Sequence, residues 1–143
     1  MISLALHGMA YIANNNNRTI SIKEIASGIE ASEAHLAKVM QRLVREGLAH
    51  SERGPKGGFT LTRQPEKITL LHIYQAFDNN MEKTDCPMAR NKCPFEHCLF
   101  GGILGELEGR LDDFLGSQTL ASFVNREEQG KEQSPGEEEQ GKV

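Results

Sequence analysis

Residues 35–62 read HLAKVMQRLVREGLAHSERGPKGGFTLT, a basic amphipathic segment followed by a glycine-rich turn. In the first half, apolar residues recur three and four positions apart, which predicts a helix with one buried face. Gly47 is expected to end this helix, because glycine readily adopts the left-handed conformation found after helix C-termini. The apolar positions are Leu36, Val39, Met40 and Leu43, and the other sides carry His35, Lys38, Gln41, Arg42 and Arg45.

The second half predicts a β-hairpin. Residues 49–52 and 59–62 can pair as strands around RGPKGG, where the glycines permit tight-turn dihedrals and Pro55 stiffens the loop. Arg53 and Lys56 are then expected at the tip of the hairpin.

A short helix is expected just before the basic one. Ser21 and Glu24 form a capping box at its start, and Ser32 can cap the basic helix after a tight turn. Taken alone, the basic helix also fits an ordinary amphipathic helix with a solvated face. Two helices joined by a tight turn and followed at once by a basic hairpin instead predict a winged helix-turn-helix. The fold class is therefore mainly α, with a small two-stranded β wing.

The sequence after Cys98 predicts a long dimerisation helix. Apolar residues recur there at alternating spacings of four and three, as in a two-heptad seam: Phe100, Leu104, Leu107, Leu111 and Phe114. A core helix would show the same pattern, but so small a winged domain offers little surface to bury it. The expected organisation is a DNA-binding winged helix-turn-helix domain (1–79), a cysteine loop (80–98), a dimerisation helix region (99–124) and a disordered acidic tail (125–143).

The formal net charge of -4 belongs mostly to the tail. Residues 125–143 carry six Glu against three basic residues, whereas residues 38–63 hold six basic residues against two Glu. A cationic patch of this kind suits the phosphates of double-stranded DNA. The acidic total therefore does not exclude DNA binding.

All three cysteines lie in one short stretch, as Cys86, Cys93 and Cys98. The N-terminus lacks a basic n-region, a cleavage site and a membrane-spanning length of about 20 apolar residues, which predicts a cytoplasmic protein without membrane contact. In a reducing cytosol, clustered cysteines favour metal binding or redox chemistry over structural disulfides.

Together these segments resemble the IscR/NsrR/CymR-type family of bacterial winged-helix regulators, often called the Rrf-two family. The resemblance covers nearly the whole chain except the tail and rests on SIKEIA (21–26), HLAKVMQRLVREGL (35–48), SERGPKGGFTLT (51–62) and PEKITLLHIYQAF (65–77). HLAKV with RGPKGGF is most similar to the nitric-oxide-responsive, NsrR-like branch. The resemblance implies an iron–sulfur cluster, [2Fe-2S] or [4Fe-4S], held by Cys86, Cys93 and Cys98. Thiolates are soft ligands that suit iron, so the chemistry agrees.

Two features depart from the family pattern. Six residues and then four separate the cysteines, whereas the spacing in the family is more even. Ser3 and Gly101 occupy the positions of the family's fourth ligand. His7, Glu96 and His97 are possible substitutes, although each also fits a solvated or structural role. Otherwise the start of the chain is truncated, or the fourth position is open to an external ligand.

The expected function is that of a homodimeric, sequence-specific DNA-binding regulator, a repressor that binds a palindromic operator. Its cluster is expected to sense nitric oxide, redox state or cluster supply. Lys38, Arg53 and Lys56 are assigned chiefly to phosphates, and Ala34 and His35 to base edges. The full set of expected DNA contacts is Ser32, Ala34, His35, Lys38 and Arg42 on the helix and Arg53 and Lys56 on the wing.

Two alternatives stay open. The first keeps DNA binding but replaces the cluster with zinc, held by the thiols and His97, or with a thiol redox switch. The second is a small iron–sulfur electron carrier or enzyme. No nucleophile–base pair, paired carboxylates or phosphate-binding glycine loop stands out in the sequence, so the chain is not expected to be an enzyme.

Overall fold

The computed structural model describes residues 1–77 and 93–124. Over these ranges the chain is mainly helical with one antiparallel hairpin, which confirms the predicted winged helix-turn-helix. None of the described helices has the length and apolar character needed to span a membrane. In chain order the elements are α1 (Ile2–Asn14), α2 (Ile22–Gly28), α3 (Glu33–Arg45), β1 (Ala49–Glu52), β2 (Gly58–Leu61), η1 (Pro65–Lys67), α4 (Leu70–Gln75), α5 (Ile103–Ser117) and η2 (Leu120–Phe123).

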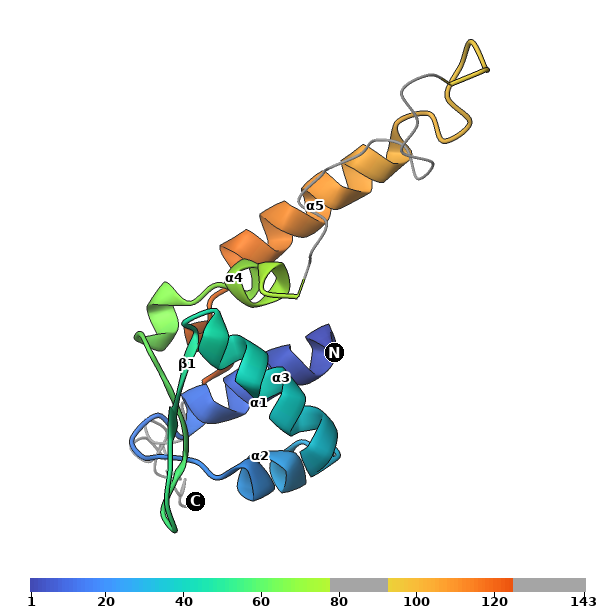
Figure 1. Ribbon diagram of the computed structural model, residues 1–143. Helices are drawn as coiled ribbons and strands as arrows, with labels where there is room; N and C mark the ends of the chain where they lie inside the picture. The colour runs from blue at the N-terminus through green and yellow to red at the C-terminus, as the bar shows by residue number, and fades with distance from the viewer. Residues whose placement is uncertain (78–92, 125–143) are drawn as a thin grey trace, which may run out of the picture.

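The core forms where the apolar faces of α1, α2, α3 and α4 meet. Figure 1 shows α1, α2 and α3 gathered in the lower part of the molecule, with α4 above them at the foot of α5. Met9 and Ile12 of α1 are fully buried in it, as are Ile25 of α2 and Ile73 of α4. Burial of one such side chain stabilises the fold by about 1.5–3 kcal/mol. All four predicted apolar positions of α3 are buried, so the sequence pattern identified the inner face of this helix correctly.

Local signals set the helix ends largely as predicted. The Ser21 hydroxyl accepts a hydrogen bond from the Glu24 backbone N–H at 3.2 Å and caps α2. Gly47 follows α3 with φ +72°, the left-handed conformation expected of it. Ser32 is the N-cap residue of α3 as predicted, but its side chain makes no capping hydrogen bond.

The wing is an antiparallel hairpin tied to the helices by a backbone bridge. The N–H of Ile20 donates to the Phe59 carbonyl at 3.0 Å, and the N–H of Phe59 donates to the Ile20 carbonyl at 2.8 Å. Ile20, in the segment between α1 and α2, therefore pairs with β2 through a one-residue antiparallel bridge. Strand β2 begins one residue earlier than predicted, and the paired residues are Ala49 with Leu61, His50 with Thr60, Ser51 with Phe59 and Glu52 with Gly58.

Helix α5 projects away from the rest of the protein, as Figure 1 shows. Its C-terminal end is fixed beside the start of α4, because the Leu70 N–H donates to the Gln118 carbonyl and the Leu120 N–H donates to the Ile68 carbonyl, both at 2.9 Å. Leu115 is buried at this end. Fifteen residues extend about 22 Å as an α-helix, so the other end of α5 lies far from the core.

Gly58→Ala tests how far the wing depends on its close approach to the helices. A Cβ at residue 58 would lie 2.2 Å from the Ile20 carbonyl oxygen, and this backbone contact can be relieved only by moving the wing. We expect the free energy of unfolding in urea to fall by about 1–3 kcal/mol. Gly109→Ala on α5 is the control, since a Cβ there meets no described atom within 4 Å. An equal loss of unfolding free energy in Gly58→Ala and Gly109→Ala would show that the close approach of Gly58 to Ile20 does not affect stability.

Candidate DNA-binding face and cysteine loop

Helix α3 presents a polar stripe directly opposite its buried face. Successive residues of an α-helix are rotated by about 100°, so positions 34, 38, 41 and 45 fall on the side away from the core. All four side chains at these positions are exposed. We call this set the outward face of α3; it consists of Ala34, Lys38, Gln41 and Arg45.

Most of the predicted DNA-contacting residues are exposed at or beside this face. Ser32 and His35 are exposed at the start of α3, and His35 lies at the flank of the outward face. Arg53 and Lys56 are exposed in the turn between β1 and β2, so the hairpin carries its positive charge at the tip as predicted. The structure therefore gives these residues, with Ala34 and Lys38, the accessibility that DNA contact requires.

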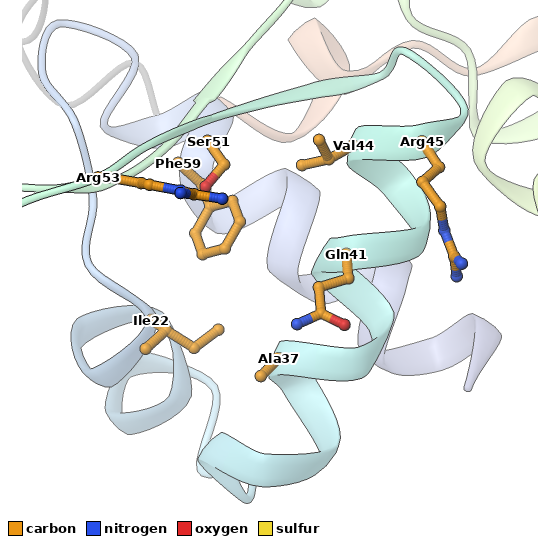
Figure 2. A pocket seen from close by; sticks show the side chains of 8 residues that line it. All are labelled: Ile22, Ala37, Gln41, Val44, Arg45, Ser51, Arg53 and Phe59. Atoms are coloured by element: carbon orange, nitrogen blue, oxygen red, sulfur yellow. The ribbon is translucent and has the colours of Figure 1, made fainter.

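A hollow of about 620 Å³ separates α3 from the wing. Figure 2 shows Arg53 and Phe59 of the wing across from Gln41 and Ala37 of α3, with Ile22 of α2 below. A concave surface with cationic edges, lying between a helix and a wing, suits the DNA strand that runs between a major groove and the adjacent minor groove. The hollow is lined by Ile22, Ala37, Gln41, Val44, Arg45, Ser51, Arg53 and Phe59.

Three polar residues of this surface, Gln41, Arg45 and Ser51, were not among the predicted DNA contacts. Gln41 and Arg45 lie three and seven residues after Lys38, so helical spacing alone could have placed them beside it. A glutamine at the centre of a recognition helix can bind the N6 and N7 atoms of adenine. Ser51 carried no such signal, because its position depends on how the hairpin is placed against α3.

Arg42 lies away from the outward face. Its Nε donates to the Ala76 carbonyl at 2.6 Å, and its guanidinium carbon lies 5.2 Å from the centre of the Phe77 ring. The side chain is half-buried between α3 and the end of α4. The prediction grouped Arg42 with the DNA contacts, but its guanidinium binds another part of the same chain.

The cysteine loop is described only in its second half. Cys93 and Cys98 are both exposed and no disulfide joins these two described cysteines, whereas Cys86 lies outside the described residues. In residues 1–77 and 93–124, no three His, Cys, Asp or Glu side chains gather in a way that could hold a metal ion. Two accessible thiols on one short segment nevertheless match the donor chemistry of a soft metal centre. The predicted three-thiol site is thus compatible with the part of the loop that the structure describes.

The candidate fourth ligands differ in their surroundings. Gly101 has φ +57° and no side chain to offer, and Glu96 and His97 are exposed beside Cys98. His7 lies one helical turn after Ser3, and its Nδ1 is 2.7 Å from the Ser3 carbonyl. A carbonyl can only accept, so this contact uses Nδ1 as the donor and leaves Nε2 as the ring nitrogen that could bind a metal. Metal-binding histidines commonly have this arrangement.

Helix α5 carries an apolar stripe that the described residues leave exposed. Leu107 is 54% exposed and Phe114 58%. Leu104, also predicted in the seam, is half-buried, and Phe100 lies before the first turn of the helix. We call this set the α5 stripe; its strongly exposed members are Phe100, Ile103, Leu107, Leu111 and Phe114.

The model of the Rrf2 family, described as iron-dependent transcriptional regulators, matches residues 1–126. The chain belongs to the Rrf2 family. This confirms the resemblance to the Rrf-two family, and the chain is accordingly a transcriptional regulator and not an enzyme. The match spans the winged helix-turn-helix, the cysteine loop and α5.

Relatives of this Rrf2 protein agree with the assignment. An HTH-type transcriptional regulator of Aquifex aeolicus is 32% identical over 130 residues, covering 89% of this chain and 90% of the relative. The regulator IscR of Erwinia tasmaniensis is 29% identical over 128 residues, covering 90% of this chain and 73% of IscR. The aligned region in both cases extends well beyond the winged domain.

Solved structures show the same fold. T. potens IscR superposes with a TM-score of 0.73 at 21% identity, covering 94% of this chain and 90% of IscR. CymR, the global cysteine regulator of B. subtilis, superposes with a TM-score of 0.67 at 25% identity, covering 87% of this chain and 95% of CymR. The winged fold of the present chain is therefore the fold of these regulators.

Gln41→Ala and Arg53→Ala should affect DNA binding in different ways. Loss of a base-reading glutamine should relax sequence preference at one base pair by about 1–3 kcal/mol. Loss of a phosphate-binding arginine should weaken binding to all sequences and lower the salt slope by about one. Fluorescence anisotropy with a panel of single-base operator variants, at several salt concentrations, separates the two effects. A changed sequence preference in Arg53→Ala would refute its assignment to phosphate.

Proposed function

We propose that this Rrf2 protein is a homodimeric, sequence-specific repressor whose cysteine loop holds an iron–sulfur cluster that senses nitric oxide, redox state or cluster supply. The observation that carries the proposal is the combination of a cationic helix–wing face with two exposed thiols on the segment before α5. The first feature suits DNA and the second suits a reactive metal centre. The similarity to the NsrR-like branch favours nitric oxide as the signal.

A second copy of this chain is the proposed occupant of the α5 stripe. The stripe lies on a helix that projects from the body, where the described part of its own chain leaves it exposed. Two such stripes are complementary to each other under two-fold symmetry, as in most soluble dimers. A symmetric pair would also present two α3 helices to half-sites about 34 Å apart on a palindromic operator.

Cys86, Cys93 and Cys98 are the proposed protein ligands of the cluster, either [2Fe-2S] or [4Fe-4S]. When bound, such a centre supplies a group whose charge and ligation change on reaction with nitric oxide or on oxidation. His7 is our candidate for the fourth ligand, because its Nδ1 is held by the Ser3 carbonyl and its Nε2 could bind a metal. On a second subunit it would complete the site across the dimer.

A zinc site or a thiol switch is the second candidate for the loop. Exposed His97 directly precedes exposed Cys98, and three thiolates with one imidazole would satisfy tetrahedral zinc. Exposed thiols that are not joined to each other could equally be oxidised reversibly. Anaerobic purification distinguishes these cases, because a brown protein with visible absorbance contains iron and sulfide, whereas a colourless one with bound zinc does not.

DNA binding with and without the signal tests the proposed function. Anaerobically purified protein should bind its own promoter fragment in a gel shift and lose affinity after a stoichiometric addition of nitric oxide. Cys93→Ser should lack the visible absorbance and show no response to nitric oxide. Ser122→Ala, an exposed position outside the loop, is the control and should behave as the unmodified protein does. Equal binding before and after nitric oxide, in protein shown to hold iron, would refute nitric oxide as the signal.

A double substitution on α5 tests the homodimer. Leu107→Glu with Leu111→Glu should give a monomer in size-exclusion chromatography with light scattering, because two buried charges would face their own copies. Both side chains are more than a third exposed in the single chain, so its core should survive the change. Gly109→Glu adds a charge to the opposite side of α5 and should leave the dimer intact. A double variant that stays dimeric would place the interface elsewhere.

A further inference from the structure

We propose that Arg42 is a positioning residue that transmits the state of the cysteine loop to the recognition helix α3 and makes no DNA contact itself. This inference rests on the proposed function, since it presupposes that the loop controls DNA affinity. It assigns Arg42 a role different from that of its neighbours Lys38 and Arg45 on the same helix.

Arg42 binds the C-terminal end of α4 directly. Arg42 Nε donates to the Ala76 carbonyl at 2.6 Å, and Ala76 is the C-terminal cap residue of α4. The last carbonyls of a helix have no partner within that helix, so a cationic donor satisfies Ala76 especially well. The guanidinium also lies over Phe77, with 5.2 Å between its carbon and the ring centre. A planar group that donates at its edge and stacks on its face holds its partner in one orientation.

The α4 end of this contact leads into the cysteine loop. Ala76 is buried, so the end of α4 is packed against the core. Phe77 is the last residue before the segment that contains Cys86. Helix α4 also packs against α5, and the segment preceding α5 contains Cys93 and Cys98. The chain that leaves α4 therefore leads into the cysteine loop, and the chain that leaves the loop returns to α4 through the C-terminal end of α5.

On α3, Arg42 lies close to residues of the outward face. It lies one residue after Gln41 and three before Arg45, both of which belong to the outward face. A displacement of the end of α4 would pull or release Arg42 and so shift the two side chains next to it. Changes of about 1 Å in a recognition helix are enough to make or break hydrogen bonds to base edges. Loop rearrangement can thereby change DNA affinity without any direct contact between loop and DNA.

The same geometry argues against a DNA contact by Arg42. Its Nε and its planar face are both used within the protein, at the flank of α3 that faces α4. These two contacts hold the whole guanidinium, with its Nη1 and Nη2 groups, at this flank and away from the outward face. Arg45, by contrast, is exposed on the outward face.

The experiment compares operator affinities for two loop states in each of three backgrounds. Dissociation constants are measured anaerobically by anisotropy for the unmodified loop and for Cys93→Ser, each in the background of native Arg42, Arg42→Lys or Phe77→Leu. In the native background the two loop states should differ. In both Arg42→Lys and Phe77→Leu, the ratio between loop states should fall at least about threefold toward one, a typical size for energetic coupling. Arg45→Lys is the matched control and should leave that ratio unchanged.

The salt dependence of binding provides the second readout. Arg42→Met should keep the slope of the native protein, whereas Arg45→Met should lower it by about one. Circular dichroism melts confirm that each variant is folded. If Arg42→Met does not fold, the ratio of dissociation constants in Phe77→Leu still tests the coupling. An unchanged ratio in Arg42→Lys and Phe77→Leu, or a slope lowered by one in Arg42→Met, would overturn the inference. If the dissociation constants of the two loop states are equal in the native background, the sensing function is overturned, and the coupling with it. The salt slope of Arg42→Met still shows in that case whether Arg42 contacts DNA.

Discussion

Burial of the apolar stripe of α3 is the constraint on which the DNA-binding face depends. Leu36, Met40 and Leu43 have no exposed surface, and turning α3 to present another side would cost about 1.5–3 kcal/mol for each of them. The outward direction of Gln41 and Arg45 is therefore fixed by residues that never meet DNA. The backbone bridge between Ile20 and Phe59 then sets the wing against the same core, so helix and wing have one relative position.

In the described residues, the proposed sensing part of the molecule is attached to this face through α4 and the C-terminal end of α5. The C-terminal end of α5 is paired with the start of α4, while its other end carries the cysteine segment away from the core (Figure 1). Short α4 is in contact with α1 and α5, and its end binds Arg42 of α3. A regulator arranged in this way can keep its DNA-binding core rigid while the loop changes state. In this proposal, a change in the cysteine loop reaches the core only through the side chains of these contacts.

Much of the fold was predictable because its signals are local. Helical spacing identified the inner face of α3, and Ser21 and Gly47 marked helix ends through chemistry that acts within a few residues. Features that depend on distant pairing carried no such signal. Arg42 and Ala76 are 34 positions apart in the sequence, so their hydrogen bond leaves no local signal. Arg42 was therefore predicted as a DNA contact, like the other basic residues of the helix. The hairpin was predicted to within one residue, but its bridge to Ile20 was not. The ligand role of Cys86 stays a prediction, since this residue lies outside the described ranges.

In the proposed complex, the outward face of α3 reads DNA while the flank of α3 at Arg42 stays bound to α4. The most direct measurement is a crystal structure of the anaerobic protein with its operator. The account predicts the outward face in the major groove, with Gln41 within hydrogen-bond distance of a base edge and Arg42 Nε still on the Ala76 carbonyl. A complex in which Arg42 has left Ala76 for a phosphate, or in which the outward face of α3 lies away from the groove, would contradict it.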